Sequence, residues 1–325
     1  MANHRPVLGV EVTGWGMALP RSSYTNDELI AQYGLDSDNE WIRTRTGIES
    51  RYIAEADETV VTLGAKAGRL ALESAGLAPP AAIDYLFLGS TTSPTYSTVP
   101  GSHPAIVKQL GEQGYDIQAS EETNTACTSF VTALLNSYRQ FAVDGIERAL
   151  VIGADKLSAI TEYRDRSTSI LFADGAGAVV MEKTERRSGL LGWSQETKGS
   201  LDTLLSSPPG GTLQMEGPEV FKHAVSFMVE HARNALQEAE TDTDEIALVV
   251  PHQANVRIIE AANRRLGIDM DKTAVSIGHF GNTSSASIPL ALTEALHAGR
   301  LVRGEKALLV GFGAGMTVAA AVIEW

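Results

Sequence analysis

The chain has 325 residues, of which 43% are hydrophobic and 20% charged, and its formal net charge is -14. This length exceeds the usual size of one domain, so we expect two domains or one large duplicated domain. The negative net charge argues against nucleic acid or an anionic membrane as the main partner. The single cysteine excludes an intramolecular disulfide and fits a reducing compartment such as the cytoplasm.

The first residues lead directly into a strand-like run near 7–12. They show no signal-peptide pattern, and no run reaches the roughly 18 apolar residues that span a bilayer, so we expect neither signal nor anchor. Short apolar runs then alternate with helical patterns, which predicts an α/β fold. The expected elements are a helix over 60–75, a strand over 85–89, a helix over 128–141 and a strand over 149–153.

The later part of the chain repeats this order. One section superposes without a gap, placing Cys127 over Ser285 and Gly153 over Gly311. Amphipathic helix–strand pairs resemble one another by chance, but three pairs in the same order favour a duplication. We therefore expect two similar halves, residues 1–185 and 186–325. The looser matches are 84–88 with 245–249 and 176–181 with 317–323.

The cysteine is the first candidate for chemistry. Cys127 lies at the predicted start of a helix, where free N–H groups and the helix dipole favour a thiolate. Cysteines titrate near about 8.5, and such a position, with a nearby histidine, lowers this value. Taken alone, a single cysteine among alanines is more often a buried small hydrophobe.

Three further segments lie at strand or helix ends. His252 follows an apolar strand, so its ring should project from the carboxyl end of the strand, where sites in α/β sheets gather. Asn282 precedes a predicted helix in the second half. When the two halves are aligned, its segment falls at the place that Cys127 occupies in the first half. The third segment is the glycine-rich turn 311–315. Each segment also has a plainer interpretation: His252 fits an exposed loop histidine, Asn282 a helix cap, and the glycine-rich turn a simple tight turn. A pseudo-twofold fold would bring all of them together.

At this point the chain resembles a known family, the β-ketoacyl-acyl carrier protein synthase III enzymes. The resemblance runs collinearly over almost the whole chain, and it implies a thiolase fold, which is a duplicated five-layered αβαβα arrangement. The segments that carry it are 40–48, Thr125-Ala126-Cys127, Asp174-Gly175-Ala176-Gly177-Ala178, Pro251-His252-Gln253-Ala254-Asn255 and Gly281-Asn282-Thr283-Ser284.

The resemblance also implies a reaction. Cys127 would take an acyl group from acyl-CoA, and His252 and Asn282 would promote decarboxylation of malonyl-acyl carrier protein by holding the thioester oxygen. The N–H groups of Cys127, Ala314 and Gly315 would form the oxyanion hole. The product would be a 3-oxoacyl thioester for fatty acid initiation or a related secondary-metabolite pathway. We expect no permanently bound cofactor and no metal, with acyl-CoA, the malonyl carrier protein and a second copy in a homodimer as partners.

Binding residues follow from the same resemblance. Trp41, Arg45, Arg166 and Asn255 would bind coenzyme A, which suits an indole face and guanidinium groups. Without the resemblance, Trp41 is typical of a core and the arginines of a solvated surface. A basic patch would steer an acidic carrier protein to the tunnel mouth, although it also fits an ordinary charged helix face. Its expected members are Lys222, Arg257, Arg264 and Arg265.

The acyl pocket is expected to include Phe312 and, across the dimer interface, Val99. The small side chain of Val99 stands where the family limits the pocket, which favours a starter longer or more branched than acetyl. The sequence departs from the family pattern at Ala314, which replaces a glycine, at Phe280, which replaces a frequent tyrosine, and in the polar segment 121–124.

Several other classes of protein share parts of this pattern. Papain-like proteases also order Cys, His and Asn along the chain, but their local cysteine motif is missing. Thiolase needs a second cysteine, and hydroxymethylglutaryl-CoA synthase needs a glutamate after the 85–89 strand; neither is present. A related acyltransferase that acylates an alcohol or amine stays open. A non-catalytic subunit of the same fold would lose the cysteine, which this chain keeps.

Overall fold

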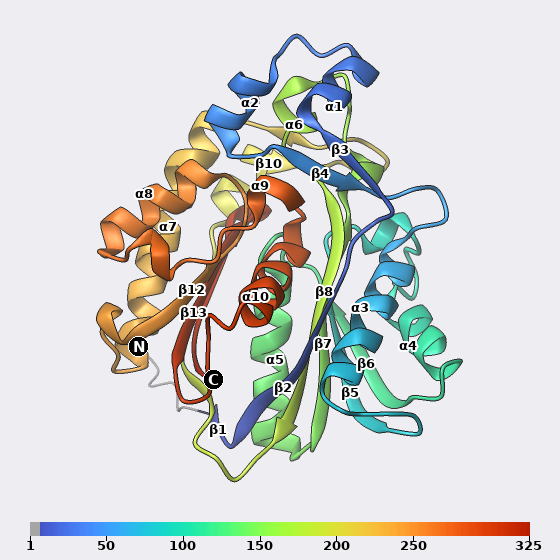
Figure 1. Ribbon diagram of the computed structural model, residues 1–325, viewed down its shortest axis with the longest axis vertical. Coiled ribbons are helices and arrows are strands. Elements are labelled where there is room, and N and C mark those ends of the chain that lie inside the picture. Colours follow the sequence, from blue (N-terminus) through green and yellow to red (C-terminus); the bar gives the residue numbers. More distant parts are fainter. Residues whose placement is uncertain (1–6) are drawn as a thin grey trace.

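The computed structural model describes residues 7–325, and its core is two five-stranded sheets (Figure 1). The first has the order β2-β8-β7-β5-β6, with bounds Val10–Ala18, Asp174–Lys183, Arg148–Lys156, Ala82–Gly89 and Asp116–Thr123. The second has the order β1-β9-β14-β13-β12, with bounds Val7–Leu8, Gly189–Thr197, Thr317–Glu324, Lys306–Gly313 and Ile246–Pro251. Within the described residues, no helix has both the length and the apolar character that crossing a membrane requires.

Helices form three layers around these sheets. The first sheet is covered outside by α3 (Val60–Ser74) and α4 (His103–Gly111), and the second by α7 (Gly217–Glu238) and α8 (Val256–Leu266). Between the sheets lie α5 (Ser129–Asp144) and α10 (Ser287–His297), as Figure 1 shows. The expected five-layered αβαβα arrangement is therefore confirmed.

The duplication is visible in the strand pairing. In the first half, the neighbouring strands β2, β8, β7 and β5 form two antiparallel pairs followed by one parallel pair. In the second half, β9, β14, β13 and β12 pair in the same order. The antiparallel pair Val151 and Val179 has its counterpart in Leu309 and Ala321. The helices α5 and α10 begin at residues 129 and 287, which are equivalent in the gapless alignment. The two similar halves expected from the sequence are confirmed, whereas the limits 1–185 and 186–325 stay a prediction.

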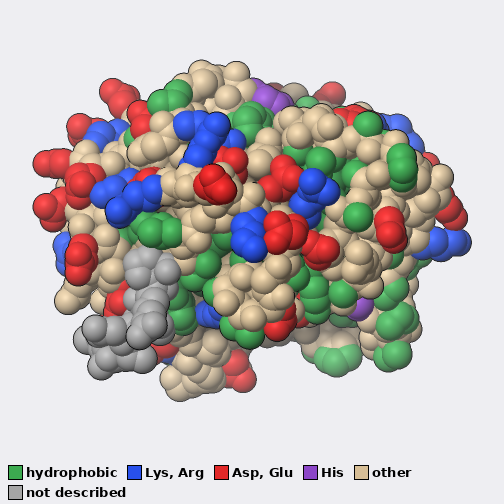
Figure 2. Space-filling model, turned by 90° about the horizontal axis from the view of Figure 1, so that it is seen from below, with side chains coloured by type: hydrophobic (Ala, Val, Ile, Leu, Met, Phe, Trp, Pro, Cys, Tyr) green, Lys and Arg blue, Asp and Glu red, His purple; other side chains and the backbone are tan. Residues whose placement is uncertain are grey.

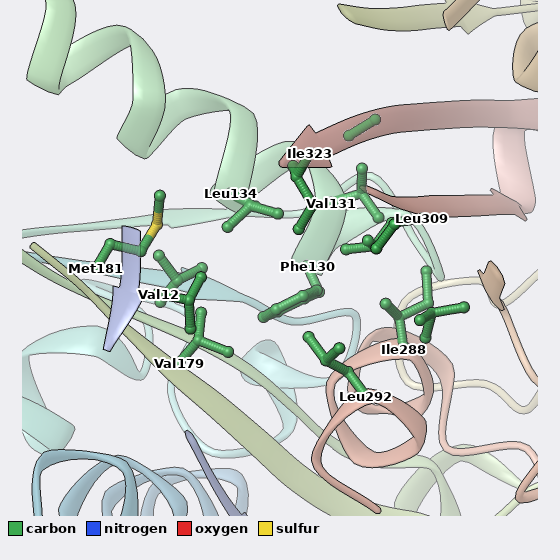
Figure 3. Close-up of a cluster of buried hydrophobic side chains, with 14 of the residues drawn as sticks. Val12, Phe130, Val131, Leu134, Val179, Met181, Ile288, Leu292, Leu309 and Ile323 are labelled. Carbon is green, nitrogen blue, oxygen red and sulfur yellow. The ribbon is translucent and has the colours of Figure 1, made fainter. Parts of the chain in front are cut away.

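The central core lies between the two sheets and is built from alternate strand residues. Phe130 on α5 packs among side chains that both sheets and α10 supply, including Val179, Leu309 and Leu292 (Figure 3). Neighbouring strand residues such as Leu308 point instead to the outer helices. This period of two is why the central strands β7, β13 and β14 are largely apolar and buried on both faces.

Glycines let the outer helices approach the sheets closely. A Cβ on Gly16 in β2 would lie 2.5 Å from the Ala67 carbonyl oxygen of α3, and one on Gly192 in β9 would lie 2.5 Å from the Ala235 carbonyl oxygen of α7. No side chain fits at such distances. The two strands are equivalent in the two halves, so the same packing device occurs twice.

The strand expected over 7–12 is wrong as a single strand. It breaks at Gly9, whose φ of +80° turns the chain from β1 in the second sheet to β2 in the first. The interpretation of the first residues as free of a signal pattern falls largely on 1–6, which lie outside the described residues.

Smaller elements form a cap over one end of the layers, at the top of Figure 1. Its helices are α1 (Asn26–Tyr33), α2 (Asn39–Thr46), α6 (Arg166–Ser169) and α9 (Ile277–Phe280), and its short strand pairs are β3 (Ser22–Thr25) with β4 (Ser50–Ile53) and β10 (Leu205–Ser206) with β11 (Gln214–Met215). On the face shown in Figure 2, acidic and basic side chains are interspersed despite the acidic net charge.

Candidate active site

Cys127, His252 and Asn282 line one cavity of about 540 Å³. Cys127 comes from the first half and the other two from the second, each from a segment that follows a strand or precedes a helix. The structure therefore brings together the three residues that the sequence separates by 125 and 30 positions. Aromatic and aliphatic side chains such as Phe312 and Leu205 form much of the remaining wall.

Cys127 lies two residues before α5, slightly outside the helix predicted over 128–141. The residue before it, Ala126, has a φ of 53°, a left-handed conformation that is uncommon outside glycine. The Asn124 side chain accepts a hydrogen bond from the Ala126 N–H and so supports this turn. Burial raises the pKa of the Cys127 thiol to about 12, and a hydrogen bond from Ser284 opposes this shift.

His252 is almost fully buried after β12 and its ring stacks edge-on against Phe312, with centroids 5.5 Å apart. Burial lowers its pKa to about 3, so the imidazole is neutral at physiological pH. Its Nδ1 lies 2.6 Å from the Ser287 hydroxyl, which also accepts the Gln253 N–H. Ser287 can therefore donate its own hydrogen to Nδ1, and the ring then carries its proton on Nε2.

Asn282 is held by its backbone and by one side-chain atom. Its N–H donates to the Leu171 carbonyl, its carbonyl accepts from the Ala173 N–H, and its Oδ1 accepts from the Ser284 N–H at 3.0 Å. With Oδ1 used in this way, the amide Nδ2 is the group left for the cavity that Asn282 lines. The asparagine thus caps a turn, as the plainer interpretation holds, and also presents a donor.

The glycine-rich turn after β13 packs against Cys127. A Cβ on Gly313 would lie 2.7 Å from the Cys127 nitrogen, so only glycine allows this approach. Gly315 has a φ of 98°, which also favours glycine, whereas Ala314 stands at a position without this demand. The turn places backbone beside the Cys127 nitrogen, an arrangement that an oxyanion site would require.

Comparisons with known proteins agree with this geometry. Residues 122–199 match the family model of 3-oxoacyl-[acyl-carrier-protein (ACP)] synthase III, and residues 236–325 match the model of its C-terminal part. A β-ketoacyl-[acyl-carrier-protein] synthase III of Desulfitobacterium hafniense is 40% identical over 98% of both chains. The chain belongs to the synthase III family. It is accordingly an acyltransferase, and the reaction of the family is a condensation that yields a 3-oxoacyl thioester.

Solved structures show the same similarity. The 3-oxoacyl-[acyl-carrier-protein] synthase III of Aquifex aeolicus superposes with a TM-score of 0.90 at 38% identity, covering 98% of this chain and 100% of that one. The priming β-ketosynthase of the R1128 polyketide pathway superposes with a TM-score of 0.89 at 34% identity, covering 100% and 98%. The expected thiolase-type fold of the family is confirmed.

Three of the residues predicted to bind coenzyme A lie at the same cavity. Trp41, Arg45 and Asn255 line it, and Trp41 is 36% exposed, so the core interpretation of this tryptophan is wrong. Arg166 does not line the cavity; its guanidinium stacks 4.7 Å from the Trp41 ring centroid and donates to the Asp36 carbonyl. Asn255 caps α8 and donates to the Arg45 carbonyl. Their roles in binding stay predictions.

The remaining predicted residues are dispersed. Phe312 lines the cavity, but Val99 is 84% exposed and does not reach the cavity of its own chain. Of the predicted basic patch, Arg257 lies at the cavity and over the Phe221 ring, and Lys222 pairs with Glu219. The other two, Arg264 and Arg265, are exposed at the end of α8. A carrier-docking role for these residues stays a prediction.

Several functional candidates were missed by the sequence interpretation. Ser287 orients His252, and Asp155 joins the turns of the two halves through buried hydrogen bonds. The gapless repeat could have drawn attention to Ser285, the partner of Asp155, but nothing local identifies Ser287. Asp174, part of a family motif, bonds Ala54 and Ser158 away from the cavity and is structural.

Among the described residues, one group has the side chains of a metal site: Glu196, Glu230 and His231. The His231 ring nitrogens are already bonded, Nδ1 to the Ser194 hydroxyl at 2.8 Å and Nε2 to Glu196 at 3.1 Å. The group lies apart from the residues that line the cavity. Hydrogen bonding explains this arrangement without an ion.

Proposed function

We propose that this enzyme condenses an acyl-CoA starter with malonyl-acyl carrier protein, using Cys127 as the nucleophile and His252 and Asn282 as hydrogen-bond donors. The observation that carries the proposal is that these three side chains meet in one cavity while Nδ1 of His252 and Oδ1 of Asn282 are tied to the protein. The atoms left for substrate, Nε2–H and Nδ2–H, are both donors.

In the first half-reaction, the Cys127 thiolate attacks the thioester carbonyl of acyl-CoA, and coenzyme A leaves as its thiolate and takes a proton from solvent. The developing oxyanion lies beside the N–H of Cys127 and the turn at Ala314 and Gly315. Fixed donors at such a place stabilise the transition state, and loss of one typically costs about a hundredfold or more in rate.

In the second half-reaction, malonyl thioester loses carbon dioxide and its carbonyl oxygen becomes an enolate oxygen. A neutral imidazole and a carboxamide stabilise this oxygen by donation and do not need to remove a proton. The enolate carbon then attacks the acyl-cysteine, the Cys127 sulfur leaves as thiolate, and the 3-oxoacyl thioester is released. The depressed histidine pKa therefore suits decarboxylation better than general-base chemistry.

The substrate sites are part of the same proposal. Trp41 and Arg45 would receive the nucleotide end of coenzyme A, with Arg166 moving off the indole face that adenine requires. Exposed Arg257, Arg264, Arg265 and Lys222 would attract an acidic carrier protein. We also propose a homodimer in the cytoplasm, in which the exposed Val99 of one protomer helps to set the starter length of the other.

The decisive experiment incubates the protein with acetyl, medium-chain and branched acyl-CoAs and malonyl-acyl carrier protein, and identifies the products by mass. The expected result is a 3-oxoacyl thioester two carbons longer than the starter, preceded by an acyl adduct on Cys127. A strong preference for acetyl would contradict the inference from Val99. Condensation by a Cys127→Ala variant, or acyl transfer to an alcohol or amine without loss of carbon dioxide, would overturn the proposed reaction.

A further inference from the structure

A short line of hydroxyl groups leads from the sulfur of Cys127 toward solvent. The Ser284 Oγ lies 3.4 Å from Sγ, and the Thr91 Oγ1 lies 3.1 Å from the Ser284 Oγ. Ser284 is buried, whereas Thr91 is half-buried and lines a second cavity of about 970 Å³. Thr91 follows β5 and Ser284 precedes α10, so the line crosses between the two halves.

The hydroxyl of Ser284 is not needed to build the turn in which it sits. Ser284 has a φ of 52°, and its N–H donates to Asn282 Oδ1. The equivalent turn in the first half has the same form, with Ala126 at a φ of 53° and its N–H on Asn124 Oδ1. Alanine is sufficient there. The serine hydroxyl is therefore an addition to the turn that contacts the sulfur.

Asp155 holds the two segments that carry these hydroxyls. Its Oδ1 accepts from the N–H groups of Thr91 and Thr92 at 2.8 Å, and its Oδ2 accepts from the Ser285 N–H at 2.9 Å. The carboxylate is fully buried, so these bonds are not shared with water. Asp155 thereby connects the backbone of Thr91 to the backbone of Ser285, the residue after Ser284. This connection holds the two hydroxyls within hydrogen-bonding distance of each other.

The sulfur needs such donors because its surroundings disfavour a thiolate. Burial raises the pKa of the Cys127 thiol, and the negative charge of Asp155 raises it further. His252, in the same cavity, is neutral and offers no cation. A thiolate at neutral pH therefore depends on hydrogen-bond donors close to Sγ.

We infer that Ser284 is a further catalytic residue, which with Thr91 forms a hydroxyl chain that donates to the Cys127 thiolate and carries its proton away. This inference rests on the proposed role of Cys127 as nucleophile. The S–H proton passes to the Ser284 oxygen as the Ser284 proton passes to Thr91 and the Thr91 proton to water, so no bond is left unbalanced. After the transfer, each hydroxyl donates toward the sulfur, which stabilises the anion.

The test is the pH dependence of the rate at which iodoacetamide alkylates Cys127 in the full chain. This assay uses neither acyl-CoA nor a malonyl substrate, so its result can be interpreted even if the proposed condensation is wrong. In Ser284→Ala, the midpoint of the profile should move to higher pH by about one unit or more, with a roughly tenfold lower rate at pH 8, because one hydrogen bond to a charged acceptor is lost. Thr91→Val should shift the midpoint in the same direction by less.

Two matched variants separate this role from a structural one. Thr91→Ser keeps the hydroxyl and should stay within about twofold of the wild type. Ser207→Ala removes an exposed hydroxyl whose partner among the described residues is the Gly211 carbonyl, and this variant should change nothing. Should Ser284→Ala fail to fold, the pair Thr91→Val and Thr91→Ser still decides the matter. Equal midpoints in the wild type and Thr91→Val, or equal shifts in Thr91→Val and Thr91→Ser, would overturn the inference.

Discussion

Removal of the Ser287 hydroxyl should slow condensation while leaving acylation of Cys127 nearly intact. The hydroxyl lies 2.6 Å from His252 Nδ1 and accepts the Gln253 N–H, so Ser287→Ala frees the ring to carry its proton on Nδ1. Nε2 would then be an acceptor facing the enolate oxygen. A buried hydrogen bond of this kind is worth about 1–2 kcal/mol, which corresponds to a loss of roughly 5- to 30-fold.

The assay separates the half-reactions. Acyl-enzyme formation is measured by mass in a single turnover with acyl-CoA, and release of carbon dioxide is measured with malonyl-acyl carrier protein. Ser276→Ala is the matched control, because Ser276 is buried beside Gln253 and its hydroxyl has no partner among the described residues. Equal slowing of both half-reactions in Ser287→Ala, or an equal loss in Ser276→Ala, would refute the tautomer argument.

Three further variants test the site. Arg45→Ala should raise KM for acyl-CoA about tenfold with kcat little changed. Arg43 lies on the same helix and pairs with Glu40 at the surface, so Arg43→Ala should leave KM unchanged. Equal KM values in the two variants would contradict the binding role of Arg45. Gly313→Ala should lower the acylation rate about a hundredfold, since its Cβ would meet the nucleophile's nitrogen at 2.7 Å, while Gly199→Ala, which has open space, should be neutral in the same assay. Burial lowers the pKa of His252 from 6.5 to about 3, so His252 takes up a proton in the unfolded chain before it does in the folded chain as the pH falls. The free energy of unfolding of the wild type, measured with denaturant, should therefore fall by about 2 kcal/mol relative to that of His252→Gln between pH 8 and pH 5. Parallel curves for the two proteins would contradict the buried neutral ring.

The sequence predicted the parts of this molecule that depend on order along the chain. The alternation of apolar runs, and the repeat that aligns Cys127 with Ser285, were sufficient for the layers and the two halves. They could not reveal where Gly9 turns the chain between sheets, because a glycine inside an apolar run fits a strand equally well until its φ is known.

Within the site, local patterns found residues at the ends of elements but not their partners. His252 was predicted because it follows a strand, whereas Ser287, 35 positions later, becomes its partner through the packing of α10. Similarly, Trp41 and Arg166 were both predicted for one ligand, yet they stack on each other across 125 positions. Contacts between segments far apart along the chain depend on packing that one sequence does not display.

The duplication also shows how the turn at Cys127 differs from the equivalent turn at Ser285. Asp155 and Gly313 are equivalent positions at the ends of β7 and β13. In one half, the Asp155 carboxylate accepts the N–H of Ser285 at 2.9 Å. In the other, the equivalent N–H belongs to Cys127, and Gly313 brings no side chain to it.

A carboxylate at position 313 would bond that N–H and place a negative charge where an acyl-transfer oxyanion must develop, which electrostatic repulsion would penalise. Glycine at this position therefore leaves the Cys127 N–H without a side-chain acceptor from position 313, as the proposed oxyanion site needs, while the aspartate of the other half uses the corresponding N–H to join the two turns. The same strand end thus supports structure in one half and, in the proposed reaction, chemistry in the other, and the halves differ both at Asp155 and Gly313 and at Ser285 and Cys127.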